Sequence, residues 1–456
     1  MRNTTKRTYI IIFLIIAFFA GLGIMLYSFI SEGDTWVANR ANALIYKGGE
    51  LTVAGTIYDS DGEILVSTEK GKRQYNSNYN KRVSTLHVVG DSAGYIATGV
   101  QTLYRSNLIG YNFVDGIYKT LSSDEGVDIK LTIDADVCAE AYSAMAGKKG
   151  TVIVYNYETG QVICMVSAPT YDPNNKPTDI NTNTSGKYDG IYMNRAISGV
   201  FTPGSTFKVV TAICAIENIP DIYSRKFKCT GKKTFGKGDV ICNGVHGTLT
   251  FERALNVSCN SVFSELANEV GKDKLTETVR ALGFGKNVTI SKAKTVRSTF
   301  DVSESTKLDL GWAGIGQYTT LVNPSQMLML MGAIANSGKA MVPYIVEESS
   351  EIVDSKNKVN SSIKLSEETA AKVKKLLRSN VKNYYSDNKF PGLEMCGKTG
   401  SAEVSNGKSH AWFVGFSNKK NFPYAIVVCL ENGGLGYTHA IPVANRVMQK
   451  VLNEVS

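Results

Sequence analysis

The chain has 456 residues, of which 43% are hydrophobic and 20% charged, a composition that excludes global disorder and supports a large folded core. With 50 Lys and Arg against 41 Asp and Glu, the formal net charge is +9, which suits a protein that works beside an anionic surface. No run of basic residues interleaved with aromatic residues is present, so we expect no nucleic-acid partner.

The first long apolar segment is predicted to cross a membrane. Residues 9–30 carry no charge, and at about 1.5 Å per residue they form roughly 33 Å of helix, enough for the hydrocarbon core. The positive-inside rule then predicts a cytoplasmic tail (1–8), a single-pass anchor (9–30) and an exported remainder. A cleaved signal peptide and a buried core helix are the alternatives, but the apolar region of a signal peptide is usually shorter and ends at a small-residue site. The flanking charges are Arg2, Lys6 and Arg7 before the segment, and Glu32 and Asp34 after it.

Eight cysteines follow this segment, a low density for a disulfide scaffold. Cys164, Cys214 and Cys429 lie in apolar runs and are expected in the core. Only Cys229 and Cys242 flank a loop-like stretch that a disulfide could close, and the sequence leaves open whether they pair. The cysteine spacing and the presence of only four histidines match no zinc pattern, so we expect no metal and no cofactor.

Two regions follow the predicted anchor. Residues 31–129 are polar, with short β-like runs and a hairpin turn at Asp61-Gly62, and we expect a small N-terminal β-rich module there. Residues 130–456 have strand-like runs at both ends, which predicts an α+β domain with an antiparallel sheet covered by helices. The helical segments between the strands are expected at residues 204–218, 251–282 and 324–336.

The strongest chemical motif is a serine three residues before a lysine. On a helix this spacing puts both side chains on one face, where an amine of lowered pKa can accept the hydroxyl proton. Ser205 and Lys208 open a segment that is apolar on every face, which should bury the lysine. The alternative, non-catalytic interpretation is a serine that caps the helix and a lysine whose amine reaches the surface. The same S-x-x-K pattern recurs, in polar and turn-rich surroundings, at Ser67, Ser291, Ser386 and Ser405.

Two further motifs could complete a site around this serine. Lys398-Thr399-Gly400, on a predicted strand, offers a cation and a hydroxyl to a substrate carboxylate, and a glycine that lets backbone approach the ligand. An S-x-N pattern occurs at Ser258–Asn260 and again at Ser386–Asn388. We favour Ser258–Asn260, because a loop held between two helical segments presents its side chains rigidly.

S-x-x-K, S-x-N and K-T-G, in this order, resemble the signature of the penicillin-recognising serine acyltransferases. Segments such as NRAISGVFTPGSTFKVVTAICAIEN and LNVSCNSVFSELA resemble class B penicillin-binding proteins over about residues 130–456. The resemblance implies a bacterial transpeptidase domain on a pedestal module, which cross-links peptidoglycan stem peptides ending in D-Ala-D-Ala and is acylated by β-lactams. The chain departs from the pattern at Ala54 and Ser60, where arginines are common, at Tyr318, where glycine is frequent, and at Ser401, where threonine is frequent.

The resemblance also implies catalytic roles. Ser205 would attack the carbonyl of the penultimate D-alanine, with Lys208 as its base. Ser258, with Lys398, would pass the proton to the departing D-alanine. An amine from a neighbouring stem peptide would then take the acyl group.

Substrate-binding roles follow from the same resemblance. Asn260 would hold the stem amide, and Thr399, followed by Gly400, would bind the terminal carboxylate. The backbone N–H groups of Ser205 and Ser401 would form the oxyanion hole.

Other functions share these motifs. A D,D-carboxypeptidase or a serine β-lactamase of the same family is possible, and the string Glu252–Asn256 matches the E-x-x-L-N deacylation loop of class A β-lactamases. We interpret that string as a coincidence within a helix. A non-enzymatic wall-synthesis scaffold is disfavoured by the intact motifs. The small module leaves no room for glycan polymerisation, so the resemblance points to a membrane-embedded lipid-II polymerase as partner.

Overall fold

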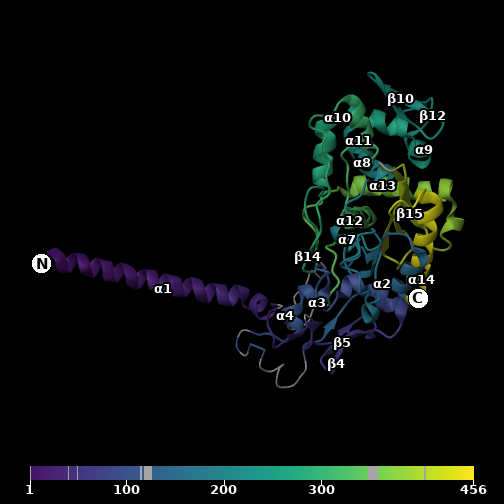
Figure 1. Ribbon diagram of the computed structural model, residues 1–456. Coiled ribbons are helices and arrows are strands. Elements are labelled where there is room, and N and C mark those ends of the chain that lie inside the picture. The colour runs from purple at the N-terminus through teal and green to yellow at the C-terminus, as the bar shows by residue number, and fades with distance from the viewer. Residues whose placement is uncertain are drawn as a thin grey trace.

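The computed structural model is shown in Figure 1. It describes residues 2–39, 41–48, 50–112, 114, 116–117, 126–347, 358–404 and 407–455.

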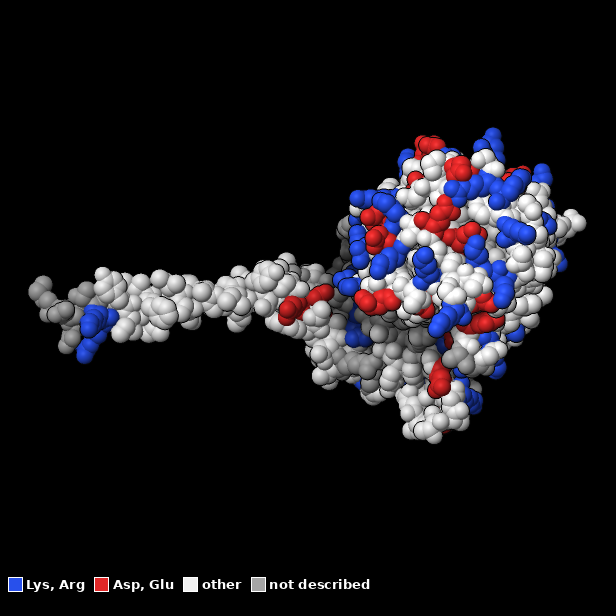
Figure 2. Space-filling model, turned by 90° about the horizontal axis from the view of Figure 1, so that it is seen from above, with Lys and Arg blue, Asp and Glu red and all other residues white. Residues whose placement is uncertain are grey.

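The first helix, α1 (Arg2–Val37), extends away from the rest of the chain (Figure 1). By length and composition it can cross a membrane, and it is the one helix of this kind in the described part of the chain. Its most apolar stretch makes no buried contact with the remainder. Figure 2 shows an uncharged surface along most of α1, with basic side chains near its N-terminal end.

A five-stranded antiparallel sheet, in the order β15-β16-β17-β7-β8, forms the centre of the C-terminal region. Val, Ile and aromatic residues dominate its inner strands, and consecutive residues of β7 and β17 are buried on both faces. The sheet therefore needs cover on both sides. Its strands are β7 (Gly150–Asn156), β8 (Val162–Ala168), β15 (Met395–Glu403), β16 (Ser409–Ser417) and β17 (Tyr424–Leu430).

Helices provide that cover. Helix α12 (Pro324–Ala335), buried along its whole length, packs against β7, β16 and β17. Helices α6 (Ala135–Ala144) and α14 (Ile441–Val455) pack against each other and against β8 and β17, respectively. Helix α13 (Glu367–Asn380) packs against α12 and β15. The predicted α+β architecture, with an antiparallel sheet covered by helices, is confirmed.

The N-terminal region carries a second sheet, in the order β5-β4-β3-β6, and helix α2 (Tyr79–Val89). Asp61-Gly62 forms the predicted turn between β3 and β4, with Gly62 at φ +87°. Strand β6 pairs in parallel with β3, so this sheet includes the first residues beyond the small module. The strands are β3 (Ile57–Tyr58), β4 (Ile64–Glu69), β5 (Lys72–Tyr75) and β6 (Ile129–Lys130).

A helical region lies at the far end of the molecule from α1 (Figure 1). It contains α8 (Lys208–Asn218), α9 (Phe251–Asn256), α10 (Asn260–Ala281) and α11 (Lys307–Gly314). Two antiparallel strand pairs join it: β9 (Phe227–Cys229) with β12 (Gly247–Leu249), and β10 (Lys232–Phe235) with β11 (Gly238–Ile241). Shorter elements are β1 (Tyr46–Lys47), β2 (Glu50–Leu51), α3 (Val100–Leu103), α4 (Arg105–Leu108), α7 (Arg195–Ser198), β13 (Thr289–Ile290) and β14 (Ala293–Lys294).

Two expected helices differ from the structure in detail. The segment 204–218 starts as a 3-10 turn, η2 (Gly204–Thr206), and the α-helix begins at Lys208. The segment 251–282 contains α9 and α10, which are separated at residues 257–259, and α10 is itself kinked at Gly271, where φ is +79°. The 3-10 turn and the break between α9 and α10 fall on the S-x-x-K and S-x-N motifs, whereas the kink at Gly271 does not.

Candidate active site

Ser205 lies on the 3-10 turn η2, and Lys208 opens α8. A 3-10 helix has three residues per turn, so side chains at i and i+3 eclipse, and the Lys208 Nζ lies 3.1 Å from the Ser205 Oγ. The turn starts at Gly204, which has φ +52°, a region that favours glycine. The predicted contact between Ser205 and Lys208 is therefore present, but a 3-10 turn forms it instead of the expected α-helix.

Lys208 is completely buried. Burial, reinforced by the positive charge of Lys398, holds the pKa of its amine well below the usual value. The amine donates to the Ser258 carbonyl oxygen at 2.7 Å and to the Asn260 Oδ1 at 2.6 Å, and it also lies 3.1 Å from the Ser258 Oγ. A neutral amine has two N–H groups and one lone pair. The two pure acceptors occupy its N–H groups, so the lone pair is left for a hydroxyl proton.

The S-x-N motif forms the connection between α9 and α10. Ser258 has φ +54°, an uncommon conformation for a residue other than glycine and one that clusters at functional sites. Its N–H donates to the Leu255 carbonyl at 3.0 Å. Asn260 begins α10, and its Nδ2 donates to the Ile241 carbonyl at 2.9 Å. The loop is held at both ends, as the sequence argument expected.

The alternative S-x-N motif, Ser386–Asn388, makes contacts that stabilise a turn. Ser386 accepts a hydrogen bond from the Asn388 N–H at 3.3 Å, and Asp387 pairs with Arg378 at 2.6 Å. These contacts close the turn that follows α13. The other S-x-x-K serines named from the sequence are elsewhere: Ser67 is in β4 and Ser291 is between β13 and β14, while Ser405 is outside the described residues.

The K-T-G motif lies on the edge strand β15. Lys398 is buried, which lowers the pKa of its amine to about 7, and its Nζ donates to the Thr399 carbonyl at 3.1 Å. The Thr399 Oγ1 lies 2.8 Å from the Tyr385 hydroxyl. A Cβ on Gly400 would lie 2.6 Å from the Pro203 carbonyl oxygen, so the glycine lets β15 approach the turn that carries the serine.

Lys398 and Ser401 make contacts that the motif alone did not indicate. Lys398 is near enough to Lys208 to lower its pKa, yet no hydrogen bond joins Lys398 to Ser258 among the described residues. The expected proton transfer between Ser258 and Lys398 therefore stays a prediction. Ser401 is exposed on β15, where its Oγ accepts a hydrogen bond from the Gly436 N–H at 3.0 Å.

Five of the eight predicted site residues border one cleft of about 790 Å³, and Lys208, Lys398 and Gly400 are not among its lining residues. Its lining includes Ser205, Ser258, Asn260, Thr399 and Ser401. It also includes Tyr385, from the π-helical turn η3 (Val381–Ser386), which the sequence analysis missed. In the sequence, Tyr385 appears only as one of two adjacent tyrosines in a polar stretch. That pattern does not predict a contact with β15.

The E-x-x-L-N string lies on α9, as expected for a helix. The Ser379 Oγ on α13 donates to the Glu252 carboxylate, and the Asn256 Nδ2 donates to the Ser379 Oγ at 3.3 Å. These contacts join α9 to α13. Asn256 also lines the active-site cleft, so the interpretation of the string as a coincidence stays a prediction.

The chain is similar in sequence to a known family and to known proteins. Residues 150–453 match the family described as penicillin binding protein transpeptidase domain. A peptidoglycan D,D-transpeptidase, PbpA, of Mycolicibacterium smegmatis is 26% identical over 448 residues, covering 90% of this chain and 89% of the relative. The stage V sporulation protein D of Bacillus subtilis is 26% identical, covering 73% of this chain and 54% of that protein.

Solved structures share the fold. The D,D-transpeptidase domain of a peptidoglycan glycosyltransferase from Eggerthella lenta superposes with a TM-score of 0.75 at 28% identity, covering 89% of this chain and 99% of that one. Penicillin-binding protein A from M. tuberculosis, solved as a penicillin G acyl-enzyme complex, gives a TM-score of 0.74 at 22% identity, with coverages of 88% and 99%. At that identity the second likeness concerns the fold alone.

Proposed function

The chain belongs to the family of penicillin-binding protein transpeptidases, and we propose that it cross-links peptidoglycan through an acyl-enzyme on Ser205. The observation that carries this proposal is the position of the Lys208 amine, 3.1 Å from the Oγ atoms of both Ser205 and Ser258. One buried base thus contacts the proposed nucleophile and the proposed proton carrier.

In the acylation step, the neutral amine of Lys208 takes the Ser205 proton as Oγ bonds to the carbonyl carbon of the penultimate D-alanine. The carbonyl oxygen becomes an oxyanion, which the backbone N–H groups of Ser205 and Ser401 would stabilise. The C–N bond to the terminal D-alanine then breaks. The proton returns through Ser258, assisted by Lys398, to the departing amine.

In the second step, an amine of a neighbouring stem peptide attacks the ester carbonyl. Its proton passes back through Ser258 and Lys208 to the Ser205 oxygen, and a new amide forms. Water in place of the amine gives a carboxypeptidase, so the outcome depends on which nucleophile reaches the cleft.

Substrate recognition is assigned to the remaining motif residues. Thr399, oriented by Tyr385 at 2.8 Å, would donate to the terminal carboxylate near the cationic form of Lys398. Asn260 is fixed between Lys208 and the Ile241 carbonyl and faces the cleft, where its amide would contact the stem peptide. Gly400 keeps the strand close to the serine-bearing turn.

The deciding experiment is mass spectrometry of the intact protein with a penicillin, followed over hours. We expect one drug mass on the peptide that contains Ser205, and persistence of this adduct. Ser205→Ala should remove the adduct, whereas Ser386→Ala should retain it. Fast loss of the adduct with turnover of the drug would instead identify a β-lactamase, and labelling that survives Ser205→Ala would refute the assignment of the nucleophile.

We further propose the domain organisation and the membrane topology. Residues 1–8 would be cytoplasmic, 9–30 the single-pass anchor, 31–129 a pedestal module and 130–456 the transpeptidase domain outside the membrane. The support is the apolar, unburied α1 together with its flanking charges. Cysteine labelling with a membrane-impermeant reagent tests this: a cysteine introduced before residue 9 should be protected in intact cells, and one after residue 31 should react.

A membrane-embedded lipid-II polymerase is the proposed partner, held by the anchor and the pedestal module. No heavy atom lies within 4 Å of a Cβ built on Gly21 or Gly23, so both are open to close approach by another helix. Replacing residues 9–30 by an unrelated apolar helix should reduce co-purification with the polymerase and leave penicillin binding unchanged. Co-purification that survives both this swap and deletion of residues 31–129 would place the contact on the transpeptidase domain instead.

A further inference from the structure

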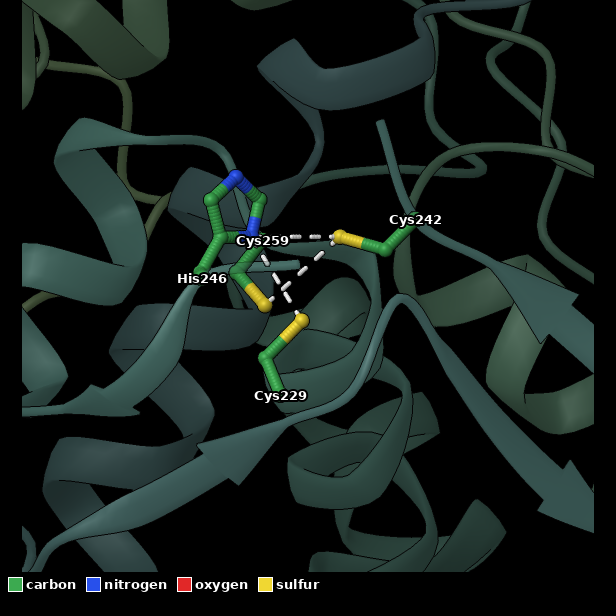
Figure 3. A group of neighbouring side chains, drawn as sticks. All are labelled: Cys229, Cys242, His246 and Cys259. Atoms are coloured by element: carbon green, nitrogen blue, oxygen red, sulfur yellow. Dashed lines mark hydrogen bonds between the residues drawn. The ribbon is translucent and has the colours of Figure 1, made fainter. Parts of the chain in front are cut away.

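Three cysteines and one histidine converge beside the S-x-N loop (Figure 3). Their four potential ligand atoms all lie within 4.8 Å of one another. They come from separate segments: Cys229 ends β9, Cys242 follows β11, His246 precedes β12, and Cys259 is the residue before α10. The cysteines are buried and the histidine is half-buried.

Three of the six ligand-atom distances in this cluster are close to those of a tetrahedral zinc site, and all six are within 4.8 Å. Zinc bonds of about 2.3 Å to sulfur and about 2.05 Å to nitrogen place two sulfurs about 3.8 Å apart, and a sulfur and a nitrogen about 3.6 Å apart. The Cys242 Sγ lies 3.7 Å from the Cys259 Sγ. The His246 Nδ1 lies 3.5 Å from the Cys229 Sγ and 3.5 Å from the Cys242 Sγ.

A disulfide explains the cluster less well. All eight cysteines are free in the structure, so the Cys229–Cys242 bridge that the sequence left open is not formed. A bridge needs a sulfur–sulfur distance of about 2.05 Å, and any pairing among three cysteines leaves one thiol over. Figure 3 shows the three sulfur atoms and one ring nitrogen facing a common centre, which is the arrangement of ligands around an ion.

We propose that one zinc ion, bound by the three thiolates and the imidazole Nδ1, braces the S-x-N loop of the transpeptidase site. The ligands are Cys229, Cys242, His246 and Cys259. Binding releases the thiol protons and needs no oxidant or reductant. Three cysteines and one histidine form a ligand set that zinc uses in closed structural sites.

The link to the catalytic loop is direct. Cys259 is the middle residue of Ser258-Cys259-Asn260, and the Asn260 N–H donates to the Cys242 Sγ at 3.2 Å. An N–H that donates to a ligating sulfur is a usual outer contact of a metal site. An ion shared by Cys242 and Cys259 would thus fix the loop against the end of β11, and with it the Asn260 side chain that contacts Lys208.

A bound ion would also stabilise the short strands that surround it. Residues 227–249 form only two-stranded sheets, and an isolated strand pair is marginal in water. The sequence analysis expected no metal, because the cysteine spacing and the presence of only four histidines matched no zinc pattern. The ligands meet through the pairing of β9 with β12 and the start of α10.

Metal content of the full-length protein in detergent tests the site itself. We expect one zinc per chain by inductively coupled plasma mass spectrometry, loss of zinc in Cys229→Ala and His246→Ala, and retention in the matched control Cys138→Ala, a buried cysteine of α6. Because the variants could unfold, the wild-type chain is also loaded with Co²⁺. Visible bands of tetrahedral cobalt with thiolate charge transfer support the site. Absence of zinc after incubation with the metal, or an octahedral cobalt spectrum, overturns it.

The bracing role rests on the proposed acylation of Ser205 and is tested separately. Removal of zinc by a chelator should slow penicillin acylation at least tenfold, and added zinc should restore the rate. Acylation that is unchanged in zinc-free protein overturns the bracing role. A zinc-loaded chain that penicillin never acylates would refute the proposed function and leave the metal assignment intact.

Discussion

Thr399 and Tyr385 form a paired contact at the edge of the active-site cleft. The Tyr385 hydroxyl lies 2.8 Å from the Thr399 Oγ1 and also accepts a hydrogen bond from the Thr399 N–H at 3.0 Å. The tyrosine is 2% exposed, and because it is anchored on η3 it fixes the orientation of the threonine hydroxyl. The residue that would bind the substrate carboxylate is therefore oriented from outside the three motifs.

Tyr385→Phe should impair acylation without unfolding the protein. The ring still fills its site, but the part-buried N–H of Thr399 loses its acceptor, at a cost of about 1 kcal/mol. We expect the second-order rate constant for penicillin acylation to fall about tenfold, with a melting temperature lowered by a few degrees. Tyr384→Phe, on the exposed neighbouring tyrosine, is the control. Equal rate constants for wild type and Tyr385→Phe would contradict the orienting role.

Acylation should depend on pH through two buried lysines. Lys208 would act as a base only in its neutral form, and its pKa lies well below the usual value because of burial and Lys398. The rate constant should therefore fall as pH drops through that lowered pKa. Lys398, whose pKa is about 7, attracts a carboxylate only when protonated, so the rate constant should also fall as pH rises above about 7.

The basic limb of this profile is assigned by Lys398→Met. Stopped-flow acylation of the free enzyme should give a bell-shaped profile for wild type. In the variant, the rate constant should be lower and the decline above neutral pH should be absent. A variant that keeps the same basic limb would show that another group titrates there.

The Arg378–Asp387 pair should stabilise the turn that carries Tyr385. Arg378 lowers the pKa of Asp387, so the pair contributes stability above the unfolded-state pKa and loses it as pH falls through the folded-state pKa. Asp387 is nearly half exposed, and screening limits the contribution to about 0.5–1 kcal/mol. Asp387→Asn should lower the melting temperature at neutral pH, and the difference from wild type should vanish in acid. A difference that persists in acid would exclude this origin.

The sequence predicted the parts of this site that depend on short spacing. Ser205 and Lys208 are three residues apart, and any helical turn brings them together. Ser258 could be chosen over Ser386 because helical patterns flank it on both sides. The sheet strands were evident from their apolar runs, which need both faces covered.

Contacts between distant segments could not be predicted in this way. Tyr385 contacts Thr399 because η3 packs beside β15. The sequence of neither segment predicts this packing. The four residues of the proposed zinc site are likewise brought together by strand pairing and by the start of α10. Helices α13 and α14 were not predicted, although both are amphipathic, with one buried apolar face.

Gly400→Ala should displace the strand that borders the nucleophile. A Cβ at this position would lie 2.6 Å from the Pro203 carbonyl oxygen and 3.0 Å from the Thr206 Cγ2, and the backbone atom cannot yield without moving the turn that carries Ser205. Overpacking of this kind costs about 1–3 kcal/mol. We expect a lower melting temperature by calorimetry and an acylation rate reduced more than tenfold, because the two segments of the proposed oxyanion hole would shift together. Ser401→Ala, the next position on β15, adds no atom to this contact and should keep the wild-type melting temperature within a few degrees. If Gly400→Ala matches wild type in both measurements, the close approach of β15 to the serine-bearing turn is not required for catalysis.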